Sequence, residues 1–228
     1  MYAFLGGVIP SLLWLWFWLN EEENPEPKMM LTAIFIMGMA AVIVVLPIEK
    51  FIQTYVSSSV GQVILWATAE EILKYLAVLL LLYKTNNTEE PIDWPIYMIT
   101  AALGFAALEN TLFLIKPFST GGLTSTILNA TSLDQLRFLG ANLLHAVASG
   151  TVGIAIGLSF FMSEFEKKWS LFIGFLFAIA LHSAFNFFII KDNGNKLGVF
   201  AFLWVVTIIV MLIFEKVRRM SEKVLLIK

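Results

Sequence analysis

The sequence predicts an all-α protein, a polytopic bundle of about seven transmembrane helices. Of its 228 residues, 59% are hydrophobic and 14% are charged, whereas a soluble domain has roughly 45–50% apolar and 25% charged residues. The mean hydropathy is +0.83. Apolar runs of about 18 residues or more, which cross a hydrocarbon core of about 30 Å as a helix, recur along the chain. We therefore expect residues 1–228 to form a single integral membrane domain within the lipid bilayer.

The first apolar run is predicted to be a retained span. No basic residue precedes it and no clear small-residue cleavage site follows it, which argues against a signal peptide. The next runs are separated by EEENPEPK, by a segment that begins at Lys50, and by TNNTEEPID. The last runs are separated by a Ser-, Thr- and Gly-rich stretch, by SEFEKK and by DNGNK, all of which are turn signals. The predicted spans are 2–19, 29–49, 61–83, 95–116, 136–162, 169–190 and 198–214.

Lysine and arginine are distributed unevenly between the two predicted membrane faces. The face that holds the first, third and fifth connections and the C-terminus carries nine of them, and the other face carries five. Cytoplasmic segments of membrane proteins have an excess of these residues. We therefore expect a multi-pass protein of the cell membrane with a cytoplasmic C-terminus and an external N-terminus.

Composition excludes two kinds of site. The chain has no cysteine, so disulfides and thiolate metal sites are excluded. Its net charge is −2, and lysine and arginine cluster only in the C-terminal tail. A nucleic-acid partner is not expected, because that function requires a basic surface.

A few ionisable residues fall well inside the predicted spans. Each charge at a helix centre opposes membrane insertion by about 2.5–3.5 kcal/mol, so such residues indicate function by default. Four different spans place them at a similar depth, on the order of 10–14 Å below one membrane face at 1.5 Å per residue. A structural role explains a single buried pair, such as Glu71 with Lys74, better than it explains this convergence. The residues are Glu70, Glu71, Lys74, Glu109, His145 and His182.

Helical spacing groups these residues further. Lys74 can pair with Glu70 at i, i+4 or with Glu71 at i, i+3, and the two adjacent glutamates point about 100° apart, so we expect them to have different roles. His182 and Asn186 share one helix face, as do Asn142, His145 and Ser149. Gly153 and Gly157 form a GxxxG pattern that favours close helix packing.

The ordered motifs resemble one known family, the PrsW intramembrane proteases, within the clan of the CAAX prenyl endopeptidases and bacteriocin-processing enzymes. The resemblance covers nearly the whole chain. After a Trp-rich first span, the matching elements are Asn24-Pro25-Glu26-Pro27, EExxK at Glu70 to Lys74, Gly104-Phe105 with Glu109-Asn110, His145, and HxxxN at His182 to Asn186.

The resemblance implies a glutamate-dependent membrane endopeptidase that cleaves membrane-anchored proteins, such as anti-sigma factors. Glu70 would activate water, and His182 with Asn186 would stabilise the oxyanion. The prenyl endopeptidases have EExxxR and FxxxH where this chain has EExxK and FxxxE, so the roles of Glu109 and His145 stay open. The resemblance and the convergence of buried polar residues together predict the catalytic set Glu70, Glu71, Glu109, His145, His182 and Asn186, supported by Lys74, Asn110 and Asn142.

The sequence favours a metal-free reaction, with zinc as the alternative. His145, His182 and Glu70 offer a ligand set that catalytic zinc accepts, but no HExxH pattern is present. Without a metal, activity should survive chelation.

Two non-proteolytic functions also fit the polar cluster: a scaffold that binds a partner's helix, and a proton-coupled transporter. A scaffold needs no base at Glu70, and no internal repeat typical of secondary transporters is visible.

Overall fold

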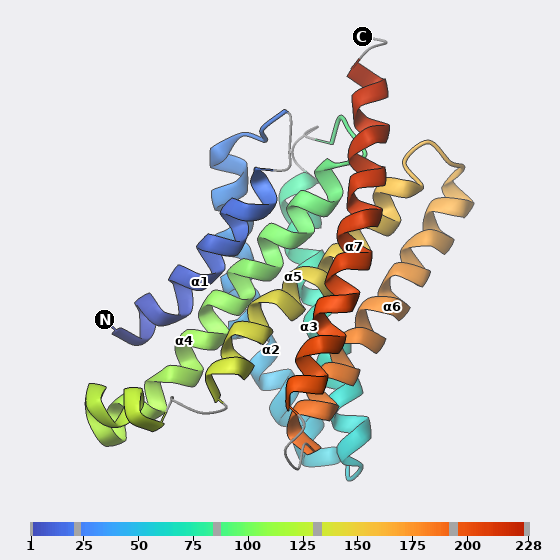
Figure 1. The fold of residues 1–228 in the computed structure, drawn as a ribbon. Helices are drawn as coiled ribbons and strands as arrows, with labels where there is room; N and C mark the ends of the chain where they lie inside the picture. Colours follow the sequence, from blue (N-terminus) through green and yellow to red (C-terminus); the bar gives the residue numbers. More distant parts are fainter. Residues whose placement is uncertain (1, 21–23, 84–87, 130–133, 192–195, 226–228) are drawn as a thin grey trace.

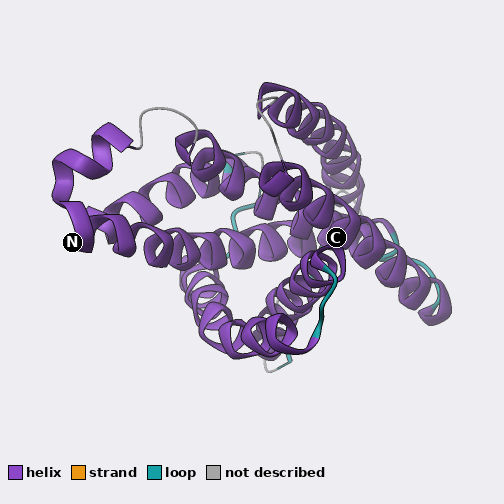
Figure 2. Cartoon of the chain, turned by 90° about the horizontal axis from the view of Figure 1, so that it is seen from below, coloured by secondary structure: helices purple, strands orange, loops and turns teal. Residues whose placement is uncertain are grey.

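The computed structural model describes residues 2–20, 24–83, 88–129, 134–191 and 196–225. Among these residues all regular structure is helical, which confirms the predicted fold class (Figure 1, Figure 2). The helices are α1 (Tyr2–Leu19), α2 (Lys28–Tyr55), α3 (Ser59–Leu82), α4 (Asp93–Asn129), α5 (Asp134–Leu158), α6 (Glu164–Lys191) and α7 (Lys196–Leu225).

Within the described ranges, five helices are long and apolar enough to cross a membrane, and α1 is a shorter apolar helix. The five are α2, α4, α5, α6 and α7. Helix α3 is of similar length and is set apart by three charged residues in its middle, Glu70, Glu71 and Lys74. The structure therefore confirms a multi-pass membrane protein, with one helix whose polar content requires a place inside the bundle.

Helix α4 lies at the centre of the bundle. It packs most extensively against α1, α2 and α5, while α5 also contacts α6 and α7 (Figure 1). Its residues from Ile96 to Ala107 are almost all buried. This helix therefore holds the elements that carry the polar residues in fixed positions relative to one another.

Close approach of α2 and α4 depends on two glycines. A Cβ atom added at Gly38 would collide with the backbone carbonyl of Ala101, and one added at Gly104 would collide with the carbonyl of Phe35. Each glycine thus lets the backbone of the other helix come near, as small residues do in membrane bundles. The predicted GxxxG surface of α5 has the same property, because Gly153 lies against the backbone at the start of α4 and Gly157 against the carbonyl of Pro91 just before it.

Two helix starts have side-chain caps. The Ser58 hydroxyl accepts a hydrogen bond from the Gly61 N–H at 3.2 Å, which opens α3 directly after the short connection from α2. Ser163 and Glu166 form a capping box at the start of α6, with the Glu166 carboxylate accepting from the Ser163 N–H at 2.9 Å.

Three helices extend past their predicted ends. Helix α2 continues beyond residue 49 to Tyr55, α4 continues through part of the predicted connection 117–135 to Asn129, and α7 continues to Leu225. Hydrophobicity locates the apolar part of a helix, whereas backbone hydrogen bonding can continue into polar sequence, as in α2 and α7. The end of α4 is helical although it is rich in Ser, Thr and Gly, which have low helix propensity. In α7, ion pairs of Glu215 with Arg218 and Arg219, both at 2.7 Å, support the added turns.

Candidate active site

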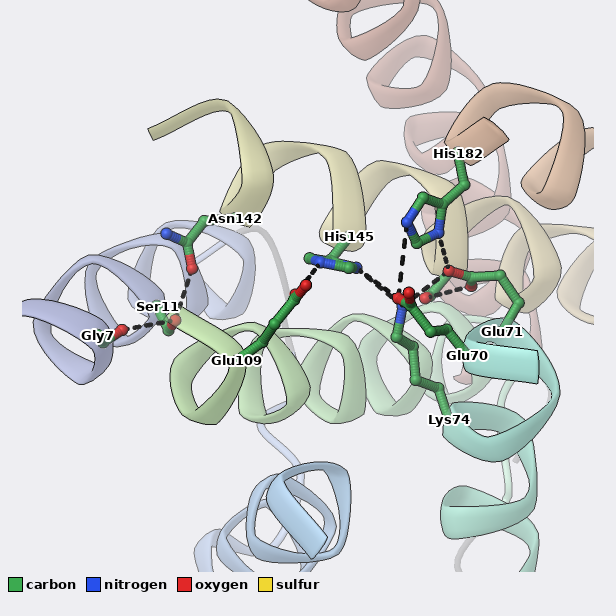
Figure 3. A network of polar contacts seen from close by, with 10 residues as sticks. Gly7, Ser11, Glu70, Glu71, Lys74, Glu109, Asn142, His145 and His182 are labelled. Carbon is green, nitrogen blue, oxygen red and sulfur yellow. Dashed lines mark hydrogen bonds and ion pairs between the residues drawn. The ribbon is translucent and has the colours of Figure 1, made fainter. Parts of the chain in front are cut away.

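Three side chains from three helices converge inside the bundle. Glu70 comes from α3, His145 from α5 and His182 from α6, and all three are buried. Glu70 Oε2 lies 3.6 Å from His182 Nε2 and 3.9 Å from His145 Nδ1. One donor atom of each residue lies within 4.8 Å of the others. Figure 3 shows the two imidazoles and the Glu70 carboxylate facing one another.

The two adjacent glutamates have different surroundings. The Glu71 carboxylate accepts hydrogen bonds from Lys74 Nζ at 2.8 Å, from the Ser149 hydroxyl at 2.6 Å and from His182 Nδ1 at 2.9 Å. Glu70 Oε2, by contrast, has no hydrogen-bond partner among the described residues. The Glu71 carboxylate therefore holds neighbouring side chains in place, whereas Glu70 has a buried oxygen that is available to bind a ligand.

Lys74 links the glutamates to His145. Its ammonium lies 2.8 Å from Glu71 Oε1 and 3.6 Å from Glu70 Oε2, so the pairing expected at both spacings favours Glu71. The same ammonium lies 2.8 Å from His145 Nδ1 and 4.5 Å above the centre of the Phe105 ring. An ammonium group only donates hydrogen bonds, so Nδ1 of His145 is the acceptor in this arrangement.

Glu109 fixes the other nitrogen of His145. Glu109 Oε2 lies 2.8 Å from His145 Nε2, which therefore carries the proton and donates to the carboxylate. Its side chain is 46% exposed, while the imidazole is buried. Glu109, which stands where the related FxxxH motif has a histidine, thus binds His145 on the side away from Glu70 and His182 (Figure 3).

His182 is held in the same way by a different carboxylate. Its Nδ1 donates to Glu71 at 2.9 Å, which leaves the lone pair of Nε2 toward Glu70. Each imidazole therefore has one nitrogen bound to a carboxylate and the other directed at the centre. A carboxylate on the outer nitrogen is the usual way in which proteins orient histidines that bind metals.

A cavity of about 260 Å³ lies beside this centre. Residues of α2, α4, α5 and α6 form its walls, and Glu109, His145 and His182 are among them. Asn110 and Asn186, two of the predicted site residues, also line it. The cavity gives a ligand access to the imidazoles and to both amide side chains.

Glu49 was not among the predicted site residues. It lines the cavity from α2 and interacts electrostatically with Glu70 and Glu109. The sequence placed Glu49 at the end of a span, where a charge is ordinary, but α2 continues six residues further to Tyr55. An acidic residue two positions after the helix-interior Pro47 was the signal that could have identified it.

Asn142 lies apart from the centre. Its side-chain oxygen accepts a hydrogen bond from the Ser11 hydroxyl at 2.6 Å, and Ser11 also donates to the carbonyl of Gly7 (Figure 3). Asn142 therefore joins α1 to α5.

The Asn24 to Pro27 motif is also remote from the centre, because Asn24 donates to Glu90 at 3.1 Å and Tyr97 donates to Glu26 near the start of α4. Tyr97 precedes Glu109 by twelve residues, a rise of about 18 Å along a helix.

The converging residues fit a divalent metal ion. Two histidines and one glutamate form a ligand set that catalytic zinc uses, with a fourth position open to water. Ligand atoms about 2.0–2.2 Å from a tetrahedral zinc lie about 3.4 Å apart, close to the 3.6 and 3.9 Å separations from Glu70. The buried oxygen of Glu70 without a partner is the atom that such an ion would engage. Lys74 would then leave His145 Nδ1 and keep its bond to Glu71.

The fold and this centre together define a polytopic membrane protein with a buried carboxylate–imidazole site. Residues 26–214 match the family model described as PrsW family intramembrane metalloprotease. The chain belongs to the PrsW family of intramembrane proteases.

Curated relatives carry the name Protease PrsW. The chain is 26% identical to the protein of Geobacillus kaustophilus over 205 residues, which is 87% of this chain and 85% of the relative. It is 25% identical to that of Shouchella clausii, over 96% of both chains, and 26% identical to that of Bacillus subtilis, over 90% of this chain and 92% of the relative. No solved structure matches the chain. These relatives favour the protease interpretation over the scaffold and the transporter.

Proposed function

We propose that the protein hydrolyses peptide bonds of membrane-anchored proteins at a divalent-metal site formed by Glu70, His145 and His182. The observation that carries the proposal is the convergence of three buried donor atoms, with each imidazole held from behind by a carboxylate. The description of the matching family as a metalloprotease supports it. The sequence favoured a metal-free site, and the geometry supports the alternative that it left open.

A bound zinc ion would polarise the scissile carbonyl and supply a nucleophilic water at neutral pH. The protein's own residues position the reaction. Glu109 and Glu71 fix the two imidazole rings through hydrogen bonds of 2.8 and 2.9 Å. Lys74 balances the charge of Glu71 inside the bundle, where an unpaired carboxylate would be costly.

Asn186 is proposed to donate a hydrogen bond to the oxygen of the scissile carbonyl. It lines the cavity next to His182, and an amide donor held in a low-dielectric site stabilises the charge that develops on that oxygen. His182, which the family resemblance pairs with Asn186 in this role, has one nitrogen bonded to Glu71 and the other directed at Glu70. We therefore assign His182 to the metal and only Asn186 to the substrate.

The location of the cavity supports a proposal for the substrate class. Its walls are transmembrane helices, and apolar residues such as Val42, Leu46 and Phe113 line it together with the polar ones. A substrate must therefore approach from within or beside the bilayer. We propose single-span regulatory proteins, such as anti-sigma factors, cut in the outer half of the membrane if the C-terminus is cytoplasmic.

A second candidate mechanism uses the same centre without a metal. Glu70 Oε2 has no hydrogen-bond partner among the described side chains, and a glutamate in that state can take a proton directly from water. Glu70→Gln lowers turnover in both mechanisms, by roughly two to four decades if Glu70 is the general base. Metal content separates them.

The experiment uses purified protein in lipid vesicles with a set of fluorogenic single-span peptides. We expect one zinc ion per chain, loss of cleavage on removal of the metal by a chelator, and recovery on addition of zinc. Folded Glu70→Gln protein should bind zinc more weakly and cleave slowly. Full activity in metal-free protein would support the second mechanism, and full activity of Glu70→Gln would exclude both.

A further inference from the structure

A second amide in the cavity wall has an unused hydrogen-bond donor. Asn110 lies on α4 next to Glu109 and is 5% exposed. It lines the same cavity as Asn186 of α6. Its Nδ2 has no hydrogen-bond partner within the part of the chain that the structure describes. The N–H groups of Nδ2 thus lack an acceptor among the described residues.

A buried donor without an acceptor destabilises a fold, and nearly all buried polar groups in native structures avoid this state. The neighbouring polar residues illustrate the rule. Glu71 has three hydrogen-bond donors around it, and Asn142 accepts from Ser11 at 2.6 Å. The unused donor of Asn110 is therefore an exception, and it occurs beside the cavity that the proposed reaction requires.

We propose that the Asn110 side-chain amide donates a hydrogen bond to the oxygen of the scissile carbonyl, which makes Asn110 a second catalytic residue beside Asn186. The inference rests on the proposed function. Rotation about the Cβ–Cγ bond of asparagine has a broad energy profile, so Nδ2 can turn toward an oxygen in the cavity. With His182 committed to Glu71 and Glu70, Asn110 supplies the donor that the family resemblance had assigned to that histidine.

The step that Asn110 assists is the addition of water. The water oxygen bonds to the carbonyl carbon, and the electron pair of the C=O π bond moves to the carbonyl oxygen, where Asn110 and Asn186 donate. Collapse of this adduct breaks the C–N bond. Both protons of the water end on the leaving amine, so the products are a carboxylate and an ammonium group. Because charge on the oxygen grows only during the reaction, the contribution of Asn110 should affect turnover more than substrate binding.

The test compares Asn110→Leu with Asn142→Leu, two substitutions of a buried asparagine by a residue of similar size. Zinc-loaded proteins in lipid vesicles are assayed with fluorogenic single-span peptides and with self-quenched fluorescent casein. For Asn110→Leu we expect kcat to fall about 10²- to 10³-fold, with KM and zinc content unchanged. Its melting temperature should equal or exceed that of wild type, because no protein hydrogen bond is lost. Asn142→Leu should melt at a lower temperature.

Asn110→Asp provides a second variant that preserves shape. It replaces the donor by an acceptor, so its kcat should fall at least as far as that of Asn110→Leu. Wild-type kcat in either folded variant would overturn the inference and leave the proposed function intact. A loss of kcat in proportion to a lower melting temperature would assign Asn110 a structural role instead. No cleavage by folded, zinc-loaded wild type would overturn the proposed function itself, and with it this inference.

Discussion

Glu109 Oε2 lies 2.8 Å from Nε2 of His145, although the two residues are 36 positions apart in the sequence. This contact gives Glu109 a role that its motif did not reveal. It holds the imidazole so that Nδ1 points toward Glu70 and His182. A carboxylate in the position of a related histidine is therefore compatible with the proposed metal centre, because it would orient a ligand without being one.

The first prediction concerns this contact. Glu109→Leu should weaken zinc binding about 10- to 100-fold, the usual effect of removing a carboxylate that orients a ligating histidine. Glu109→Gln should weaken it less, because the glutamine carbonyl can still accept from Nε2. Competition with a chromophoric chelator measures both affinities in detergent. Wild-type affinity in folded Glu109→Leu protein would show that His145 is oriented by other contacts or does not bind the metal.

The second prediction compares two ion pairs of the same spacing and length. Glu71–Lys74 and Glu164–Lys167 are both i, i+3 pairs at 2.8 Å, but the first is fully buried and the Glu164 side chain is 81% exposed. Glu71→Gln removes the nearest carboxylate from Lys74, whose other carboxylate partner, Glu70, lies 3.6 Å away. It also weakens the bonds to Ser149 and His182. It should cost about 3–5 kcal/mol of stability.

The matched control is Glu164→Gln, which should leave the unfolding midpoint close to that of wild type, because exposed ion pairs contribute little to stability. Unfolding midpoints of both variants in mixed detergent micelles measure the difference. Equal midpoints would mean that Glu71 is not required to hold the fold. Cleavage that survives Glu70→Gln but disappears in a folded Glu71→Gln protein would exchange the roles of the two glutamates.

Much of the fold could be predicted from the sequence, because few backbone structures can span a membrane. A spanning segment has to satisfy its backbone hydrogen bonds internally, so each apolar run predicts one helix and consecutive helices alternate in direction. The same rule made Glu70, His145 and His182 conspicuous, since polar residues at membrane depth require partners. Their roles were less accessible. Hydrogen bonds to Glu109 and Glu71 determine which nitrogen of each imidazole faces the centre. These hydrogen bonds form only because α3, α4, α5 and α6 are rotated so that the side chains meet.

Two features of the cavity wall were the hardest to predict. Glu49 was missed because hydropathy ended its span at the first charge, whereas the helix continues and presents Glu49 to the cavity. The unused donor of Asn110 is also invisible in the sequence, because an asparagine beside a glutamate carries no sign of whether its amide has an acceptor. Such features depend on packing and appear only when the neighbours are known.

The third prediction concerns orientation. The count of nine lysine and arginine residues on the face of the C-terminus against five on the other predicts a cytoplasmic C-terminus. Alkaline phosphatase fused after Lys228 should be inactive in cells, and green fluorescent protein fused there should fluoresce. Phosphatase activity at this position would reverse the topology. It would also place Glu70, Glu109 and the cavity in the inner half of the membrane.

The last prediction tests the close contact of α2 and α4 that places Glu109. A Cβ at Gly104 would lie 2.8 Å from the carbonyl carbon of Phe35 and 3.0 Å from its Cα, backbone atoms that cannot move without the helix. Gly104→Ala should therefore force the helices apart at a cost of about 1–3 kcal/mol. Because Glu109 lies five residues further along α4, about 7.5 Å, the shift should also lower turnover. A Cβ at Gly150 meets only the flexible Ile99 side chain, at 3.3 Å. Gly150→Ala should thus unfold near the wild-type midpoint. Equal midpoints for the two variants would contradict the close contact of α2 and α4 at Gly104.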